Sequence, residues 1–168
     1  MPQSIVVMGV SGAGKSSVGQ ALATRLGASF VDGDTLHPEA NVRKMASGVP
    51  LTDDDRWPWL HLVGTKLSAS TEKPTIVACS ALKRSYRDAI RTAAPATTFI
   101  LRKADRPALQ DRLTQRPGHF MPASLLTSQL ETLEELQTDE SGLMVESTGG
   151  IDPTVERIRR LLEQSAAD

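Results

Sequence analysis

The chain has 168 residues, 39% of them hydrophobic and 23% charged, which is ordinary globular usage and excludes disordered chains, collagen-like repeats and disulfide scaffolds. A formal net charge of −1 excludes the strongly basic surface of a protein whose main partner is nucleic acid. Because Cys79 is its only cysteine, the chain forms no intrachain disulfide and suits a reducing cytoplasm.

The N-terminal segment predicts a strand, a tight turn and a helix in direct succession. The β-branched run from Ser4 to Met8 is closed by Gly9, which favours a buried parallel strand. This run is too short for a signal peptide or a membrane span, so no membrane partner is expected. From about Lys15 the pattern predicts a helix with one apolar stripe, ended by Gly27.

Strand and helix patterns alternate along the rest of the chain. Further apolar runs predict buried strands at Ser29 to Val31, Thr75 to Cys79, Thr97 to Leu101 and Leu143 to Val145. Helical patterns cover residues 38 to 47, 56 to 69, 82 to 93, 105 to 115, 122 to 136 and 153 to 163. This order predicts one three-layer α/β/α domain over residues 1–168, built on a mostly parallel, five-stranded sheet.

The loop after the first predicted strand matches a phosphate-binding motif. Residues 9 to 16 spell GVSGAGKS, which fits G-x-x-x-x-G-K-[ST] between a strand and a helix. Glycines let the backbone N–H groups curl around phosphate oxygens, and a helix N-terminus adds partial positive charge. A glycine-rich surface turn is the alternative, but the strand and helix on either side favour ATP binding. Nucleotide contacts are expected from Gly9, Val10, Ser11, Gly12, Ala13, Gly14, Lys15, Ser16 and Ser17.

Single side chains in and after this loop have separate predicted roles. Lys15 would reach the β- and γ-phosphates during transfer, and the Ser16 hydroxyl would ligate Mg²⁺. Asp32-Gly33-Asp34 follows the second strand, at the sheet edge where α/β folds bind ligands. Asp34 is the candidate base that orients an acceptor hydroxyl, and Asp32 would lie nearer the metal. A plain D-G-D turn is the alternative.

The segments GVSGAGKSSVG at 9 to 19, DGDTLHPEANVRKMASGVPLTDDDRWPWL at 32 to 60, CSALKRSYRDAIR at 79 to 91 and RPGHFMPASLLTSQLETLE at 116 to 134 resemble the gluconate kinases. These are P-loop small-molecule kinases related in fold to shikimate and nucleoside monophosphate kinases. The resemblance implies a P-loop kinase fold with a substrate-binding segment at about 32–60 and a helical lid at about 112–125. It also implies ATP- and Mg²⁺-dependent phosphorylation of D-gluconate to 6-phospho-D-gluconate, for pentose phosphate or related sugar-acid routes, by a homodimer.

Three basic residues are candidates to bind the carboxylate of a sugar acid, because arginine's fork matches a carboxylate. Arg56 is the first of them. Pro58 favours a helix with Asp55 as its cap, which would put Arg56 in the first turn near the cleft. The acidic run before Arg56 is itself explained as a cap and first turn, and a surface arginine is the alternative. Lys83 and Arg84, at the start of a later helix, are the other two candidates.

His37, Asn41 and Lys44 are spaced to bring polar groups to the same place. On a helix that begins near Pro38, Asn41 and Lys44 share a face, and His37 lies at the entry. A capping histidine and a solvated lysine would give the same pattern. Ser80 ends the third strand, where many P-loop ATPases carry an acid for Mg²⁺. We expect Ser80 to contact the substrate.

A lid is predicted from two arginines and a mobile-looking segment. Arg112 and Arg116 lie at i and i+4 on one helical face and would point into the Pro- and Gly-rich RPGHFMP, which begins at Arg116. A closing lid excludes water and brings arginine onto the transferring phosphoryl group. Arg116 is the candidate for that group, Arg112 for the nucleotide and His119 for the substrate, although a surface histidine is the bland alternative.

Two other functions fit parts of the pattern. A kinase for another small hydroxylated metabolite, such as shikimate, would share the phosphate motif and differ in residues 32–60. A nucleotide-dependent switch would also carry the motif. The guanine-binding tetrapeptide N-K-x-D is absent, however, and the D-x-x-G of Asp139 to Gly142 does not follow a buried strand. The sequence therefore favours an enzyme.

Overall fold

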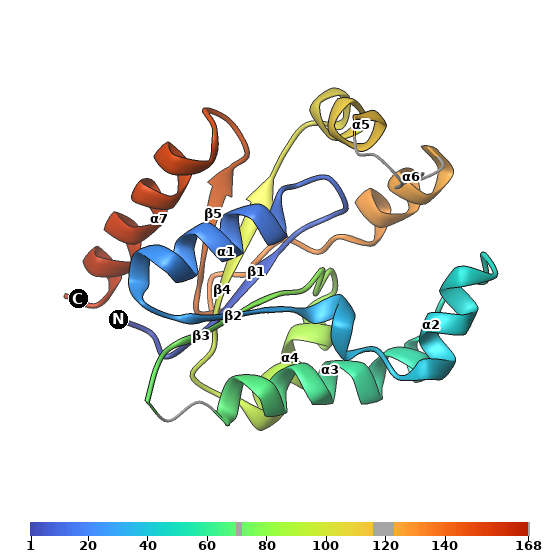
Figure 1. Ribbon diagram of the computed structural model, residues 1–168, viewed down its shortest axis with the longest axis horizontal. Helices are drawn as coiled ribbons and strands as arrows, with labels where there is room; N and C mark the ends of the chain where they lie inside the picture. The colour runs from blue at the N-terminus through green and yellow to red at the C-terminus, as the bar shows by residue number, and fades with distance from the viewer. Residues whose placement is uncertain (70–71, 116–122, 168) are drawn as a thin grey trace.

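The computed structural model describes residues 1–69, 72–115 and 123–167, which are arranged as Figure 1 shows. The strands are β1 (Ser4–Met8), β2 (Ser29–Asp32), β3 (Thr75–Ala78), β4 (Thr98–Lys103) and β5 (Gly142–Glu146). The helices are α1 (Lys15–Leu26), the 3₁₀ turn η1 (Gly33–Leu36), α2 (Glu39–Ala46), α3 (Asp53–Ser68), α4 (Arg84–Ala93), α5 (Arg106–Thr114), α6 (Ala123–Thr132) and α7 (Ile151–Ser165). None of the helices in these ranges is long and apolar enough to cross a lipid bilayer.

The strands form one sheet in the order β2-β3-β1-β4-β5, and each neighbouring pair is parallel. This confirms the parallel sheet that the alternation of strands and helices predicts. The central strand β1 has partners on both sides, so that Val6 pairs with Val77 of β3 and Phe99 of β4. Because the strands run the same way, the loops after their carboxyl ends meet at one edge of the sheet.

Helices cover both faces of the sheet, which completes the three predicted layers (Figure 1). Alternate residues of β1 point to opposite faces. Ile5 and Val7 are packed in a core with residues of α1 and α7. Val6 and Met8 are packed in a second core with residues of α3 and α4. A strand buried on both faces is apolar throughout, which is why β1 has an unbroken hydrophobic run.

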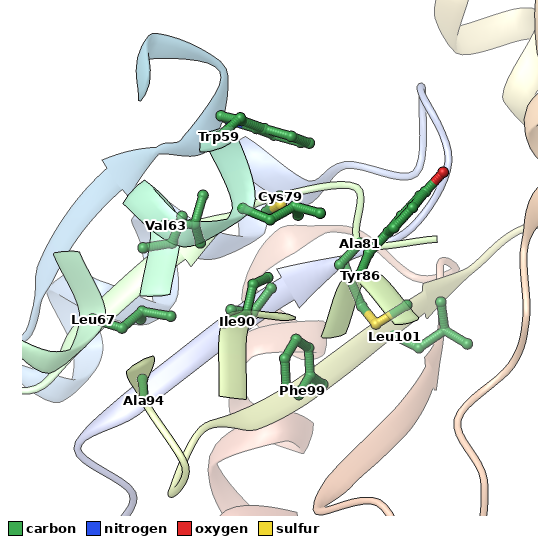
Figure 2. Close-up of a cluster of buried hydrophobic side chains, with 14 residues drawn as sticks. Trp59, Val63, Leu67, Cys79, Ala81, Tyr86, Ile90, Ala94, Phe99 and Leu101 are labelled. Carbon is green, nitrogen blue, oxygen red and sulfur yellow. The ribbon is translucent and has the colours of Figure 1, made fainter. Parts of the chain in front are cut away.

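The second core joins two helices to the sheet. Figure 2 shows Trp59, Val63 and Leu67 of α3 and Tyr86 and Ile90 of α4 gathered beside Phe99 and Leu101 of β4. A third, smaller core lies under the predicted phosphate loop. There Val10 and Ala13 of the loop pack with Leu109 and Leu113 of α5 and Leu126 of α6. The loop is therefore seated on the two helices that flank the predicted lid.

The start of α3 corrects the prediction that Asp55 caps a helix beginning at Arg56. The N-cap is Thr52, whose hydroxyl accepts a hydrogen bond from the Asp55 N–H at 3.2 Å. In return the Asp55 carboxylate accepts from the Thr52 N–H at 2.9 Å, which is a reciprocal capping box. Pro58 is tolerated one turn into the helix because the carbonyl that it leaves without a donor belongs to the exposed residue Asp54.

The end of α6 is also earlier than predicted, at Thr132 rather than 136. The Glu134 N–H donates to the Leu82 carbonyl at 2.8 Å, and the Glu134 carboxylate accepts from the Arg84 N–H at 3.1 Å. These bonds to the start of α4 satisfy groups that another helical turn would have used. Tertiary contacts thus end a helix that its apolar pattern would have continued.

Candidate active site

The predicted phosphate loop, residues 9–16, has a backbone that glycine alone adopts easily. Gly12 has φ 84° and Gly14 has φ 83°, in the left-handed region that side chains disfavour. At Gly9 a Cβ atom would lie 2.8 Å from the Arg102 carbonyl oxygen, so the strand could not pass so close with a larger residue. Gly14 is the N-cap of α1. The N–H groups and the positive end of that helix therefore lie beside the loop.

Protein donors hold several carbonyls of this loop. The Gly12 carbonyl accepts from the Arg112 guanidinium at 3.1 Å, and the Ala13 carbonyl accepts from the Ser147 hydroxyl at 3.0 Å. The Val10 carbonyl accepts from the Lys15 ammonium at 3.1 Å. The sequence predicts that Arg112 contacts the nucleotide, and in the structure Arg112 binds the loop. No motif in the sequence points to Ser147.

A residue of α6 also contacts the loop. The side-chain carbonyl of Gln129 accepts a hydrogen bond from the Ser11 N–H at 2.8 Å, across 118 positions of sequence. Gln129 lies in the segment that resembles the gluconate kinases, but no spacing rule singled it out. The helix α6, which follows the predicted lid, is thereby joined to the phosphate loop.

Lys15, Asp34 and Asp32 come together around the end of β3. Cys79 is buried there, and burial raises the pKa of its thiol to about 12. The negative charges of Asp34 and Asp32 raise this pKa further, whereas the positive charge of Lys15 lowers it. The charges of these three groups, which come from two separate loops, therefore all act on one thiol at this edge of the sheet. Cys79 itself is a buried apolar residue, as expected.

The Asp32-Gly33-Asp34 segment is a turn as well as a pair of carboxylates. An Asp32 carboxylate oxygen accepts from the Asp34 N–H at 3.0 Å and caps η1. Gly33 is required, because a Cβ there would lie 2.5 Å from the Ala78 carbonyl oxygen. The Trp59 indole N–H donates to the Gly33 carbonyl at 2.8 Å. The turn leaves the Asp34 side chain exposed at the sheet edge.

The oxygen donors suit a small divalent cation that keeps most of its water. Within the described ranges, no group of three or more His, Cys, Asp or Glu residues could hold a metal ion. Ser16 begins α1 directly after Lys15, and Asp32 ends β2. Mg²⁺ is commonly bound through one or two protein oxygens together with substrate phosphates. A hydroxyl at the start of α1 and a carboxylate at the end of β2 therefore fit Mg²⁺ better than they fit a metal that needs a full protein cage.

His37 and Asn41 line the same site on the α2 side. The His37 ring stacks on Trp59 with 4.0 Å between ring centroids. Its Nδ1 pairs with the Asn41 amide nitrogen at 3.2 Å, so Nδ1 is the acceptor and Nε2 carries the proton. Burial lowers the pKa of His37, the Asp34 charge raises it, and the Arg56 charge lowers it. Burial thus favours the neutral ring, and the charges of Asp34 and Arg56 act on it in opposite directions.

Asp55 holds α2 against α3. It accepts from the Lys44 ammonium at 2.7 Å, and its backbone carbonyl accepts from the Asn41 amide at 2.9 Å. The Lys44 hydrogen bond, followed by that of the Thr52 N–H, lowers the pKa of Asp55 to about 2. Lys44 and Asn41 thus occupy one face of α2, as predicted. Their positions are set by Asp55, for which the sequence predicts only a role in capping its own helix.

Asp53 collects the predicted acid-binding cations. Its carboxylate accepts from the Tyr86 hydroxyl at 2.5 Å and from Arg56 at 3.2 Å, and lies 3.6 Å from the Lys83 ammonium. The Tyr86 hydrogen bond is the main cause that lowers the pKa of Asp53. Arg56 and Lys83 both approach the Tyr86 ring, at 5.5 Å from its centroid. Sequence analysis missed Asp53 and Tyr86, since an acidic first turn and a core aromatic are each common.

The other predicted residues are placed differently. Arg84 binds Asp139 with both guanidinium nitrogens, at 2.6 and 2.8 Å. Its pairing gives the D-x-x-G segment a structural partner. Ser80 contributes its backbone carbonyl, which accepts from the Gly9 N–H at 3.3 Å. Arg116 and His119 lie outside the described residues, as does the middle of the predicted lid.

Known proteins match this chain over most of its length. The family model described as an AAA domain matches residues 5–136. A gluconokinase of Gluconobacter oxydans is 48% identical over 161 residues, which cover 95% of this chain and 90% of that protein. The chain belongs to the gluconokinase family.

Solved structures agree with this membership. A crystal structure of a gluconokinase from Sinorhizobium meliloti aligns with a TM-score of 0.87 and 48% identity, over 98% of this chain and 96% of that one. A shikimate kinase from Aquifex aeolicus aligns over 98% of each chain with a TM-score of 0.64, but at 17% identity. That second likeness shows the P-loop kinase fold alone. The gluconokinase family is thus favoured over the shikimate kinase alternative.

Proposed function

We propose that this protein catalyses the ATP-dependent phosphorylation of D-gluconate to 6-phospho-D-gluconate. The observation that carries the proposal is the meeting of two charge patterns at one sheet edge. In support of it, the charges of Lys15 and Asp34 both act on the Cys79 thiol, those of Asp34 and Arg56 both act on His37, and Arg56 and Lys83 share Asp53 at the starts of α3 and α4. A nucleotide phosphate and a hydroxylated acid would each find complementary groups there. Membership of the gluconokinase family supports the same substrates.

On the acceptor side, the proposal gives each group a task. The Arg56 and Lys83 cations bind the gluconate carboxylate, in exchange for part of their contact with Asp53. The His37 Nε2–H and the Asn41 and Lys44 side chains bind sugar hydroxyls, with Arg84 and Ser80 at the margin. Asp34 orients the terminal hydroxyl and accepts its proton as the oxygen attacks the γ-phosphorus, while the bond from that phosphorus to the oxygen bridging the β- and γ-phosphates breaks and ADP leaves.

On the donor side, Lys15 neutralises charge on the phosphates, and the loop from Gly9 to Ser17 surrounds them. Ser16 and Asp32 would hold Mg²⁺, which supplies electrostatic stabilisation of the phosphates when it is bound. Arg116 would reach the transferring group and His119 the acceptor when the lid closes. A cytoplasmic location, a homodimer and a place in pentose phosphate or related sugar-acid metabolism remain predictions.

A coupled assay of ADP release tests the proposal. The acceptors are gluconate, shikimate, other sugar acids and nucleosides, with glucose as a control because it shares the C6 hydroxyl and carries no carboxylate. We expect strong turnover with gluconate and little with the others. Equal rates with gluconate and with glucose would show that Arg56 and Lys83 do not bind a carboxylate. Turnover with shikimate alone would replace gluconate as the proposed substrate.

A further inference from the structure

A buried arginine lies behind the phosphate loop. Arg102 belongs to β4 and is 5% exposed. Its backbone carbonyl packs against Gly9, where a Cβ would come within 2.8 Å of it. One guanidinium nitrogen donates to the Glu146 backbone carbonyl at 3.0 Å and another to the Ser147 hydroxyl at 2.9 Å. The Arg102 Nε is buried and has no hydrogen-bond partner.

The charge of Arg102 has no ion-pair partner among the residues that the structure describes. The contrast is Arg87, which has no exposed side-chain surface and binds the Glu140 carboxylate at 2.7 Å. The Glu146 carboxylate acts on Arg102 only from beyond ion-pair distance. Burial lowers the pKa of Arg102 to about 10, with a further lowering from the Arg112 charge and an opposing effect of Glu146. Arg102 therefore stays protonated at neutral pH.

Ser147 connects this charge to the phosphate loop. Its hydroxyl accepts from Arg102 at 2.9 Å and from Arg112 at 2.7 Å, and donates to the Ala13 carbonyl at 3.0 Å. Arg112 in turn donates to the Gly12 carbonyl at 3.1 Å. Two guanidinium groups and one hydroxyl thus support the loop from outside. A buried charge without a counter-charge is costly, so chains seldom keep one unless something else compensates it.

We propose that Arg102 is a positioning residue whose buried positive charge is balanced by the phosphates of the bound nucleotide, acting through Ser147 and the phosphate loop without touching the ligand. The proposal rests on the nucleotide binding put forward under "Proposed function". It makes an unusual prediction about stability. Removal of Arg102 relieves an unpaired charge in the empty protein and weakens the complex with nucleotide.

The test compares Arg102→Met, which removes the charge, with Arg102→Lys, which keeps it. ADP affinity is measured by isothermal titration calorimetry, and the melting temperature is measured without nucleotide. We expect Arg102→Met to weaken ADP binding about tenfold, the equivalent of one charge interaction, while the melting temperature stays equal or rises. Arg102→Lys should bind ADP about as well as the wild type. The KM for gluconate should be unchanged in both variants.

Arg91→Met is the matched control, because Arg91 is a partly buried arginine paired with Glu140 at 2.8 Å. It should lower the melting temperature and leave ADP affinity unchanged. The proposal is overturned if Arg102→Met is unfolded or less stable with unchanged ADP affinity, since either result assigns Arg102 a structural role. Equal weakening by Arg102→Lys would assign the effect to hydrogen-bond geometry and overturn it too. A wild-type protein that does not bind ADP would instead refute the proposed function.

Discussion

Asp32 and Asp34 are two residues apart, yet the fold gives them different surroundings. Asp32 ends β2, and its carboxylate accepts a hydrogen bond from the Asp34 N–H. One of its oxygens is therefore engaged in capping η1. Asp34 has an exposed side chain on η1, and its charge acts on both Cys79 and His37. A base needs a carboxylate that an acceptor hydroxyl can approach. Asp34 meets this requirement better than Asp32 does.

Asp34→Asn is therefore expected to lower kcat by about a hundredfold to ten-thousandfold, the usual contribution of a general base. ADP affinity should change little, because the phosphate loop is intact. Steady-state kinetics with gluconate, together with ADP titration, separate the two effects. A variant with near-normal kcat would remove Asp34 as the base.

Lys15→Ala is the companion variant: it should abolish turnover while the circular dichroism spectrum stays native.

At the scale of elements, the acceptor side depends on how α3 begins. The capping box between Thr52 and Asp55 starts the helix, and the same Asp55 carboxylate holds Lys44 of α2. One residue thus satisfies a helix end and docks a neighbouring helix. Asp53, in the first turn of α3, forms ion pairs with Arg56 of the same helix and with Lys83 at the start of α4. The acidic run is both a helix start and the scaffold of the proposed substrate site.

Thr52→Ala should lower the free energy of unfolding by about 1 kcal/mol, the usual value of an N-cap. It should also raise the KM for gluconate more than the KM for ATP, because Asp55 loses one of the bonds that orient it. Thr65→Ala is the control, since the Thr65 hydroxyl donates to the His61 carbonyl within the same helix. Urea unfolding and steady-state kinetics measure both effects. Similar behaviour of the two variants would contradict the role of the cap.

Across the whole molecule, a buried ion cluster joins α4 to the segment before β5. Glu140 has no exposed side-chain surface and binds Arg87 at 2.7 Å and Arg91 at 2.8 Å. Burial by itself would raise the pKa of Glu140, but the hydrogen bonds from Arg87, the Gln137 N–H and Arg91 outweigh it and lower the pKa to about 2. The cluster ties residues 53 positions apart. It therefore stabilises the fold by joining α4 to the segment before β5.

Glu140→Gln should cost about 3 to 5 kcal/mol of unfolding free energy at neutral pH, because it leaves the buried Arg87 without its counter-charge. In the wild type, a folded pKa below the unfolded value means that this stability is present above pH 4 to 5 and is lost as the pH falls toward 2. Urea unfolding between pH 3 and 7 should show that loss in the wild type and a flatter profile in Glu140→Gln. Parallel profiles would contradict the assignment.

The sequence by itself determined the parts that depend on local physics. Strand and helix periods predict the parallel sheet, and the glycine spacing of residues 9–16 predicts the phosphate loop, because backbone conformation is set by nearby residues. The resemblance in residues 32–60 pointed to the acceptor.

Only the tertiary structure decided which groups meet. It brought Gln129 and Ser147 to the loop across more than a hundred positions, turned Asp53 and Asp55 from simple caps into anchors for cations, and buried Arg102 without a carboxylate partner among the described residues. Hydrogen bonds and charges act through space, and chain separation carries no information about them until the sheet has placed its loops at one edge.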